Sequence, residues 1–487
     1  MDYKKLFSCL LIFVLAVSLI GNIVLADNPL PEGADEQPNG ETDYVALWQE
    51  QFDLVPDTNT LPNWPTGPHV FAHAAIVMDV ESEGVLYAKN IHARMYPASI
   101  TKYLTALIAL ENAELTDTIY ITEASVNSVL WGYAHIGMRA GEEISLEDAL
   151  LALLLASANE VAYAIAESIG RQMGGGYDTF IQAMNERSIE LGAVNSNWMN
   201  ASGIHHDNHY TTAHDMAILA SAFYRRPEYQ DLLSVLEHQI PPMPELWEER
   251  NFGQNHWMMW EGNYHFSPYI DGGKTGFTDQ SGTTLITTAN NGEMQLVTIL
   301  LRDWGIEAYN GTVALFDYGF SNFSRYSLLL YEQCEEIGSL LNEEAHIILP
   351  FTLSFEDVER EIEVLHGNQA QVTYTYHGQF LGRVNVTLTE AYFQRIEAEE
   401  LAAREAAAAA AAVAEEQEAE REIEVDPEEE EIEEGEGVGG NIVWIILIIA
   451  NVTFLALFLL HLRRRRQEAL NKVETLRKAI ENRKNMV

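Results

Sequence analysis

Between its two hydrophobic ends this chain has only three lysines, and two of them stand where an amine could take part in catalysis. Lys102 follows Ser99 by three residues in "YPASITKYLTALIAL", and Lys274 opens the tripeptide "KTG". Residues three apart on a helix share one face, so we expect Ser99 and Lys102 side by side at the start of a helix. A lysine can take the proton of a serine when burial or a nearby cation lowers its pKa. The third lysine, Lys89, is expected in a surface strand.

Two further motifs follow the S-x-x-K pair. Ser157 and Asn159 form S-x-N, 58 residues beyond Ser99, and "KTG" begins 117 residues beyond Ser157. Each motif alone has a simpler explanation. Ser99 could merely cap its helix, Ser157 and Glu160 fit a capping box, and "KTG" could be an ordinary turn. The ordered set S-x-x-K, S-x-N and K-T-G, however, is the one used by penicillin-recognising serine enzymes.

From about Phe71 to Tyr392 the chain resembles the low-molecular-weight penicillin-binding proteins that act as serine-type D-alanyl-D-alanine carboxypeptidases. The resemblance rests on the three motifs and on "MRAGEEISLEDALLALLLASANEVAYAIAE", "NASGIHHDNHYTTAHDMAILA" and "DGGKTGFTDQSGTTLITTA". It implies an α/β transpeptidase-like domain, with an antiparallel sheet and a helical subdomain, followed by a small all-β domain. The implied partners are a peptidoglycan stem peptide ending in D-Ala-D-Ala and β-lactam antibiotics, with no cofactor.

The resemblance assigns catalytic roles to the first two motifs. Ser99 would attack the carbonyl of the penultimate D-Ala and form an acyl-enzyme, with Lys102 as the general base. Ser157 would relay a proton toward the leaving amine. Asn159 would hold the substrate amide.

The third motif is expected to bind the end of the substrate. Lys274 and Thr275 would meet the terminal carboxylate, and the charge of Lys274 would help to keep Lys102 neutral. Gly276 would let the substrate approach the strand closely. The backbone N–H of Phe277 and that of the nucleophile would hold the oxyanion.

One departure from the family leaves other functions open. Many members carry an arginine that assists carboxylate binding where this chain has Ala308, and whether the nearby Arg302 replaces it stays open. The chain could therefore be a non-catalytic wall-binding or scaffold protein that keeps a penicillin-reactive serine. A β-lactamase would need a glutamate for fast deacylation, and Glu186 and Glu190 are the positions to search.

Metal and cysteine chemistry are not expected. His205, His206, His209 and His214 are irregularly spaced and lack a carboxylate-framed helix, so we expect no metal site there. Cys334 is the only cysteine outside the first hydrophobic run, so we expect a small packed side chain and no internal disulfide.

Both ends of the chain predict export to a membrane. An apolar run after Lys4 and Lys5 ends in "VLA", typical of a signal peptide cut after Ala26, although an uncleaved anchor is an alternative. The 21 residues 442–462 contain no charged side chain and are long enough to span a bilayer. The tail that follows has nine Lys or Arg against three Glu, which places it in the cytoplasm and the preceding chain outside.

The organisation between the ends follows from composition and periodicity. Residues 27–441 carry 17 basic and 69 acidic side chains, a net charge of −52, which disfavours binding to nucleic acid or to an anionic membrane surface. The predicted segments are a signal peptide (1–26), a linker (27–64), the carboxypeptidase domain (65–323), a β-rich domain (324–392), an Ala/Glu-rich helix (393–425), an acidic linker (426–441), a transmembrane helix (442–462) and a basic tail (463–487).

Overall fold

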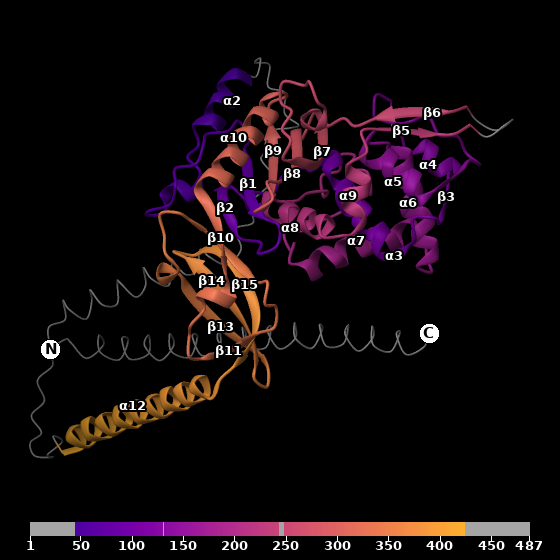
Figure 1. Ribbon diagram of the computed structural model, residues 1–487. Helices are drawn as coiled ribbons and strands as arrows, with labels where there is room; N and C mark the ends of the chain where they lie inside the picture. The colour runs from indigo at the N-terminus through magenta and orange to yellow at the C-terminus, as the bar shows by residue number, and fades with distance from the viewer. Residues whose placement is uncertain (1–43, 130, 243–247, 424–487) are drawn as a thin grey trace, which may run out of the picture. The chain divides into compact units, whose positions relative to one another are not determined.

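The computed structural model describes residues 44–129, 131–242 and 248–423 (Figure 1). The predicted signal peptide, acidic linker, transmembrane helix and basic tail lie outside these residues. Within the described ranges, no helix combines the length and the apolar character that crossing a membrane requires. The chain divides into two compact units at residue 398, inside helix α12 (Glu390–Ile423).

A five-stranded antiparallel sheet forms the centre of the first unit, in the order β2-β1-β9-β8-β7. Every residue of β1 is buried, and alternate side chains enter two different cores. Ile76 and Met78 pack with the helical subdomain, whereas Ala75 and Val77 pack with helix α10 and the β-rich domain. Both faces of the sheet are therefore covered (Figure 1). Its strands are β1 (Ala74–Asp79), β2 (Val85–Lys89), β7 (Ile270–Thr278), β8 (Gly282–Asn290) and β9 (Gln295–Asp303), and α10 spans Glu307–Asn322.

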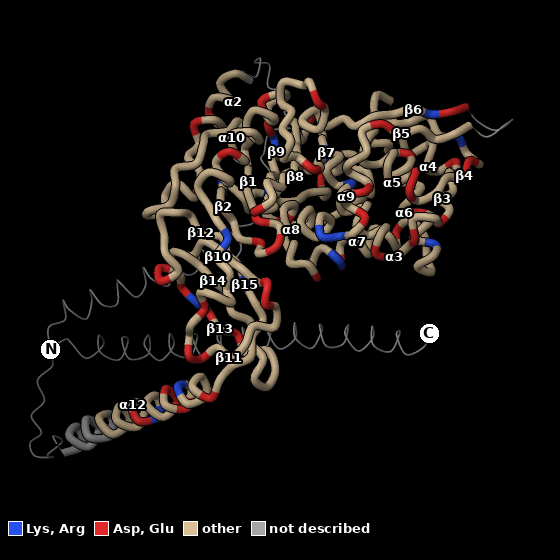
Figure 2. The backbone as a smooth tube through the Cα atoms, viewed as in Figure 1, with Lys and Arg blue, Asp and Glu red and all other residues tan. Residues whose placement is uncertain are grey.

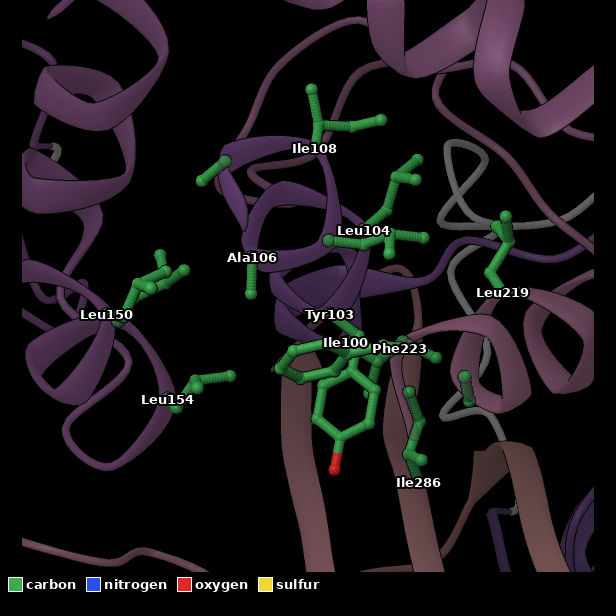
Figure 3. Close-up of a cluster of buried hydrophobic side chains, with 14 of the residues drawn as sticks. Ile100, Tyr103, Leu104, Ala106, Ile108, Leu150, Leu154, Leu219, Phe223 and Ile286 are labelled. Atoms are coloured by element: carbon green, nitrogen blue, oxygen red, sulfur yellow. The ribbon is translucent and has the colours of Figure 1, made fainter. Parts of the chain in front are cut away.

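The helical subdomain is built around helix α3 (Lys102–Asn112), whose first nine residues are buried. Figure 3 shows α3 side chains such as Leu104 and Ile108 among residues from α5, α8 and β8. The helix that carries Lys102 is thus fixed from several sides. The other elements are α4 (Glu123–Asn127), α5 (Leu146–Leu154), α6 (Asn159–Gln172), α7 (Tyr177–Leu191), α8 (Ala213–Tyr224), α9 (Glu228–Leu233), β3 (Thr118–Tyr120), β4 (Glu143–Ser145), β5 (Glu237–Ile240), β6 (Arg250–Gly253) and η3 (Trp257–Met259).

Strands then occupy the region where a small all-β domain was predicted. A four-stranded sheet has the order β11-β15-β14-β13, and β10 pairs with β12. Along β14 every second residue is buried, the pattern of a sheet with one covered face. The elements are β10 (Phe323–Ser327), α11 (Leu328–Tyr331), β11 (Ile337–Leu340), β12 (His346–Pro350), η4 (Phe355–Asp357), β13 (Glu359–His366), β14 (Gln369–Tyr376) and β15 (Gln379–Leu388). Cys334, in this region, is half-buried and free.

The end of the predicted linker is folded. Residues 44–60 form helix α2 (Tyr44–Asp53) and the short helix η1 (Asp57–Thr60). Trp48 stacks on Trp304 with ring centroids 6.0 Å apart, and Phe52 contacts Phe71 at 4.6 Å. The apolar and aromatic residues of α2 are five consecutive residues, 44–48, and Phe52, and this short segment shows too weak a helical period to predict the helix.

The expected position of Lys89 was wrong. Lys89 lies in β2 but is 1% exposed, and its Nζ donates to the carbonyls of Gln51 and Val70, each at 2.7 Å. Helix α2 supplies one of these acceptors and so covers a strand that the sequence suggested was at the surface. Figure 2 shows how sparse basic positions are beside acidic ones along the described chain.

Candidate active site

Ser99 lies in a tight turn at the head of α3. The 3₁₀ turn η2 (Ala98–Thr101) precedes α3, and Ala98 has φ +51°, a strained value for a residue with a side chain. Thr284 Oγ1 in β8 donates to the Pro97 carbonyl at 2.8 Å, holding the turn against the sheet. No side-chain capping bond forms at the start of η2 or α3, so Ser99 is not a helix cap.

Lys102 is fully buried beside Ser99. Its Nζ lies 3.0 Å from Ser99 Oγ, 2.8 Å from Asn159 Oδ1 and 2.6 Å from the Ser202 carbonyl. The amide oxygen and the carbonyl oxygen can only accept hydrogen bonds, so they accept from two N–H groups of the amine. In the neutral amine the remaining position is a lone pair, which can receive the proton of the Ser99 hydroxyl. This arrangement is that of a general base next to its nucleophile.

Electrostatics favour the neutral amine. Burial lowers the pKa of Lys102 well below its usual value, and the nearby charge of Lys274 lowers this pKa further. The carboxylate of Glu160 acts in the opposite direction. Its Oε1 accepts backbone N–H bonds from Ile136 at 2.8 Å and Met138 at 3.4 Å.

Strand β7 brings the K-T-G motif to the same place. Lys274 is 1% exposed, donates to the Thr275 carbonyl at 2.9 Å, and has its pKa lowered by burial to about 7. A Cβ built on Gly276 would lie 2.9 Å from Ser99 N and 2.3 Å from Thr284 Oγ1, so only glycine lets the strand approach this closely. Phe277 follows and is 63% exposed. Because β7 ends the sheet order, one of its edges has no neighbouring strand of this sheet.

Ser157 stands between α5 and α6 with an unused hydroxyl. It has φ +61°, is 5% exposed, and its Oγ has no hydrogen-bond partner in the described part of the chain. The capping box with Glu160 does not form, because Ala158 is the N-cap of α6 and makes no side-chain bond. Ser157 is two residues before Asn159, hence within about 7 Å of it along the backbone. A buried hydroxyl without a partner is free to bond to a substrate atom.

Asn159 positions Lys102 in this structure. Its Oδ1 accepts from Lys102, and its Nδ2 and backbone N donate to the Ala134 carbonyl at 2.9 and 3.0 Å. One N–H of the amide remains for the substrate amide expected from the sequence. All three motifs therefore border on α3, and the proton-transfer pair is in hydrogen-bond contact.

Comparison with known proteins identifies the domain that carries these motifs. Residues 62–304 match the family model described as D-alanyl-D-alanine carboxypeptidase. These residues form a domain of this family.

Two curated relatives show the degree of similarity. D-alanyl-D-alanine carboxypeptidase DacF of Bacillus subtilis is 26% identical over 264 residues, which cover 53% of this chain and 64% of the relative. D-alanyl-D-alanine carboxypeptidase DacA of Haemophilus influenzae is 27% identical over 286 residues, 54% of this chain and 65% of the relative. The chain thus spans slightly less than two thirds of the length of these relatives.

A solved structure shows the same fold. Penicillin binding protein 5 from Haemophilus influenzae aligns with a TM-score of 0.53 and 22% identity, covering 67% of this chain and 98% of that one. The penicillin-binding fold expected from the sequence, an antiparallel sheet with a helical subdomain, is thereby confirmed.

The family arginine is absent from α10. Ala308 is fully buried in the core on the α10 side of the sheet. Arg302 instead lies in β9, where φ is +55°, and its Cγ would be 3.6 Å from a Cβ built on Gly282. Gly282 begins β8, directly after the turn that follows the K-T-G strand, so Arg302 borders the far end of that hairpin.

The two glutamates considered for a β-lactamase lie on the surface of α7. Glu190 forms an ion pair with Arg187 at 3.0 Å, and Glu186 accepts from Gln182 at 2.7 Å. Both are exposed. Neither is held in a buried site of the kind that a deacylating carboxylate needs.

The four histidines do not converge. His209 is buried, with Nε2 2.9 Å from Thr101 Oγ1 and Nδ1 accepting from Met199 N, and burial lowers its pKa to about 3. The ring of His214 instead packs on the ring of His92, with an interplanar angle of 50° and centroids 5.0 Å apart. Within the described ranges, no group of three or more His, Cys, Asp or Glu side chains could hold a metal ion.

The sequence predicted no role for Ser202 or Gly203, and none for Glu160 beyond a capping box. The Ser202 carbonyl binds Lys102, and a Cβ on Gly203, which has φ +85°, would be 1.8 Å from the Ala98 carbonyl. The glycine in "NASGI" was the available signal, since a glycine often marks a close backbone approach. A carbonyl acceptor has no signature in sequence.

Proposed function

We propose that this protein is a serine-type D-alanyl-D-alanine carboxypeptidase that removes the terminal D-Ala from peptidoglycan stem pentapeptides. Its acyl-enzyme forms on Ser99, and β-lactams acylate the same hydroxyl. One observation carries the proposal. The buried Lys102 amine is 3.0 Å from Ser99 Oγ, with its two other neighbours restricted to accepting hydrogen bonds.

Acylation follows from this geometry. Ser99 Oγ attacks the carbonyl carbon of the penultimate D-Ala, and its proton passes to Lys102 Nζ. The backbone N–H groups of Ser99 and Phe277 receive the oxyanion, a kind of interaction worth about 3 kcal/mol each. When the C–N bond breaks, the proton returns through the Ser157 hydroxyl to the amine of the departing D-Ala.

Deacylation reverses the roles. Water gives a proton to Lys102 Nζ and attacks the ester carbonyl, and Ser99 Oγ leaves and recovers that proton. The shortened peptide departs with a new carboxylate. Before acylation, the cationic form of Lys274 and the hydroxyl of Thr275 bind the terminal carboxylate of the intact substrate, and this carboxylate leaves with the released D-Ala.

We also propose that the protein is exported and anchored. The apolar run within residues 1–26 would direct export, and residues 442–462 would span the cell membrane, with the basic tail in the cytoplasm. The support is the sequence pattern alone. In a bacterial host the full chain should sediment with membranes, whereas a chain ending at residue 441 should be released; a truncated chain that still sediments would contradict the anchor.

The activity is tested on the purified full chain. A peptide ending in D-Ala-D-Ala and a labelled penicillin are offered to the wild type, to Ser99→Ala and to Ser234→Ala. Ser234 is exposed and lies at the end of α9, so it is a matched control. We expect release of D-alanine and a labelled adduct with the wild type and Ser234→Ala, and neither with Ser99→Ala.

Two other results would replace the proposal. Rapid penicillin turnover without peptide cleavage would identify a β-lactamase. A stable penicillin adduct without any peptide cleavage would identify a wall-binding or scaffold protein.

A further inference from the structure

A tryptophan projects into solvent beside the candidate active site. The side chain of Trp131 is 100% exposed, the highest value among the large exposed hydrophobic residues of the described chain. It lies in the loop of residues 131–138 between α4 and β4. Full exposure of an indole costs hydration free energy that folding could have recovered by burial, so its contribution to folding does not explain its position.

Hydrogen bonds connect this loop to the residues of the candidate active site. The Ala134 carbonyl accepts two hydrogen bonds from Asn159, which itself accepts from Lys102. Ile136 N donates to Glu160, and Arg250 donates to the Gly137 carbonyl at 3.1 Å. The loop therefore borders the candidate active site.

Chain lengths place Trp131 within reach of the far end of the substrate. Trp131 is three residues from Ala134, so its Cα lies within about 11 Å of that anchor. An extended pentapeptide measures about 17 Å. The last two residues of the peptide react at Ser99. Its first residue, which bears the sugar, can therefore lie as far from Ser99 as this loop extends.

We infer that Trp131 is a binding residue for the amino-sugar that carries the stem peptide, and that it gives the enzyme a preference for glycan-linked over free peptides. This inference rests on the proposed function. A pyranose ring presents a face of C–H groups that can stack on an indole, as apolar and aromatic groups do. Such stacking needs no positive charge, which suits a chain with a formal net charge of −45.

The test compares two substrates with the full chain. One is a free pentapeptide ending in D-Ala-D-Ala, and the other is the same peptide joined to its N-acetylated disaccharide. The variants are Trp131→Ala, the conservative Trp131→Phe, and Phe351→Ala. Phe351 is 63% exposed at the end of β12 in the β-rich domain and serves as the control.

For Trp131→Ala we expect kcat/KM to fall roughly three- to ten-fold for the disaccharide peptide, the range of one aromatic contact. This loss should appear in KM. The kcat/KM for the free peptide and the rate of penicillin acylation should each change less than about twofold, a difference worth under ~0.5 kcal/mol. Trp131→Phe should keep most of the preference, and Phe351→Ala all of it. The melting temperature should not change, because the indole is exposed.

Two outcomes would overturn the inference. One is an equal loss of kcat/KM on both substrates in Trp131→Ala, which would mean that the loop only supports Asn159. The other is no loss of kcat/KM on either substrate. If the wild type cleaves the free peptide while the variants show no difference, the inference alone fails. If the wild type cleaves neither substrate, the proposed function fails with it.

Discussion

Two buried lysines of this protein lie in different surroundings. Lys89 and Lys102 are each no more than 1% exposed, and burial lowers the pKa of both. Around Lys89 the acceptors are two backbone carbonyls, and the carboxyl of Asp303 favours the cation. Around Lys102 one neighbour is a serine hydroxyl, and the charge with the larger effect on its pKa is another cation, Lys274, whose effect exceeds the opposing effect of the Glu160 carboxylate.

The comparison shows that burial alone does not make a base. The pKa of Lys89 falls only to about 8, so at pH 7 it stays protonated and joins helix α2 to the sheet. For Lys102 a neighbouring cation adds to the effect of burial, and its pKa falls much further. The structural lysine and the proposed base differ in the sign of the main neighbouring charge. They also differ in that Lys102 has a third hydrogen-bond partner, the Ser99 hydroxyl.

The largest contrast should appear in activity. Lys102→Met should lower kcat/KM for a D-Ala-D-Ala peptide by roughly 10³-fold or more, because general base catalysis supplies about 10²–10⁴-fold. Lys89→Met should change it by less than about threefold, or ~0.7 kcal/mol. Both are measured as initial rates of D-alanine release, with penicillin acylation as a second readout. Comparable losses in the two variants would remove the distinction between the lysines.

Stability should show the opposite order. Lys89→Met leaves the Gln51 and Val70 carbonyls and the Asp303 carboxyl without their cation. We expect the free energy of unfolding to fall by about 2–4 kcal/mol. Lys102→Met also leaves two acceptors without a donor, but it removes no cation that a carboxylate needs, so we expect a smaller loss than for Lys89→Met. Urea denaturation of the two variants measures this, and greater destabilisation by Lys102→Met would contradict the comparison.

The sequence predicted the lysine proposed as the base but not the structural one. Ser99, Lys102, Ser157 and Lys274 stand in motifs whose order is informative. Burial of Lys89 depends on α2, which is remote in sequence and weakly patterned, so no local signal reveals it.

The finer geometry of the site was also beyond the sequence. Lys102 is oriented by the Ser202 carbonyl, and any residue type has a carbonyl. The strained turn at Ala98 depends on contacts with Gly203 and Thr284, which only the folded chain brings together.

The close packing of β7 against η2 sustains the environment of Lys102. Gly276→Ala would force a methyl group toward Ser99 N and Thr284 Oγ1. We expect kcat/KM to fall roughly 10- to 100-fold, as a displacement of about 1 Å costs in a preorganised site. Gly176→Ala is the control, because a Cβ there meets nothing within 4 Å. Equal activity of Gly276→Ala and wild type would show that the approach of β7 is not needed.

The pH profile should reflect the two lysines of the site and not Lys89. Lys102 must be neutral to act as base, so kcat/KM should fall as the pH drops through its lowered pKa. Lys274 must be a cation to bind the carboxylate, so kcat/KM should also fall as the pH rises through its pKa of about 7, approaching tenfold per pH unit. Lys89→Met should leave both limbs in place. If the alkaline limb shifts in Lys89→Met, that limb reports the titration of Lys89 and not that of Lys274.

The most direct test titrates the lysines themselves. The chain has eight, so NMR of the protein with ¹³C- or ¹⁵N-labelled lysine can resolve each amine, and the Lys102→Arg and Lys89→Arg variants assign the two signals. We predict that the pKa of the Lys102 amine lies well below the usual range of a lysine, and that Lys89 titrates near pH 8. A Lys102 amine that remains protonated up to pH 10 would contradict its role as the base for Ser99.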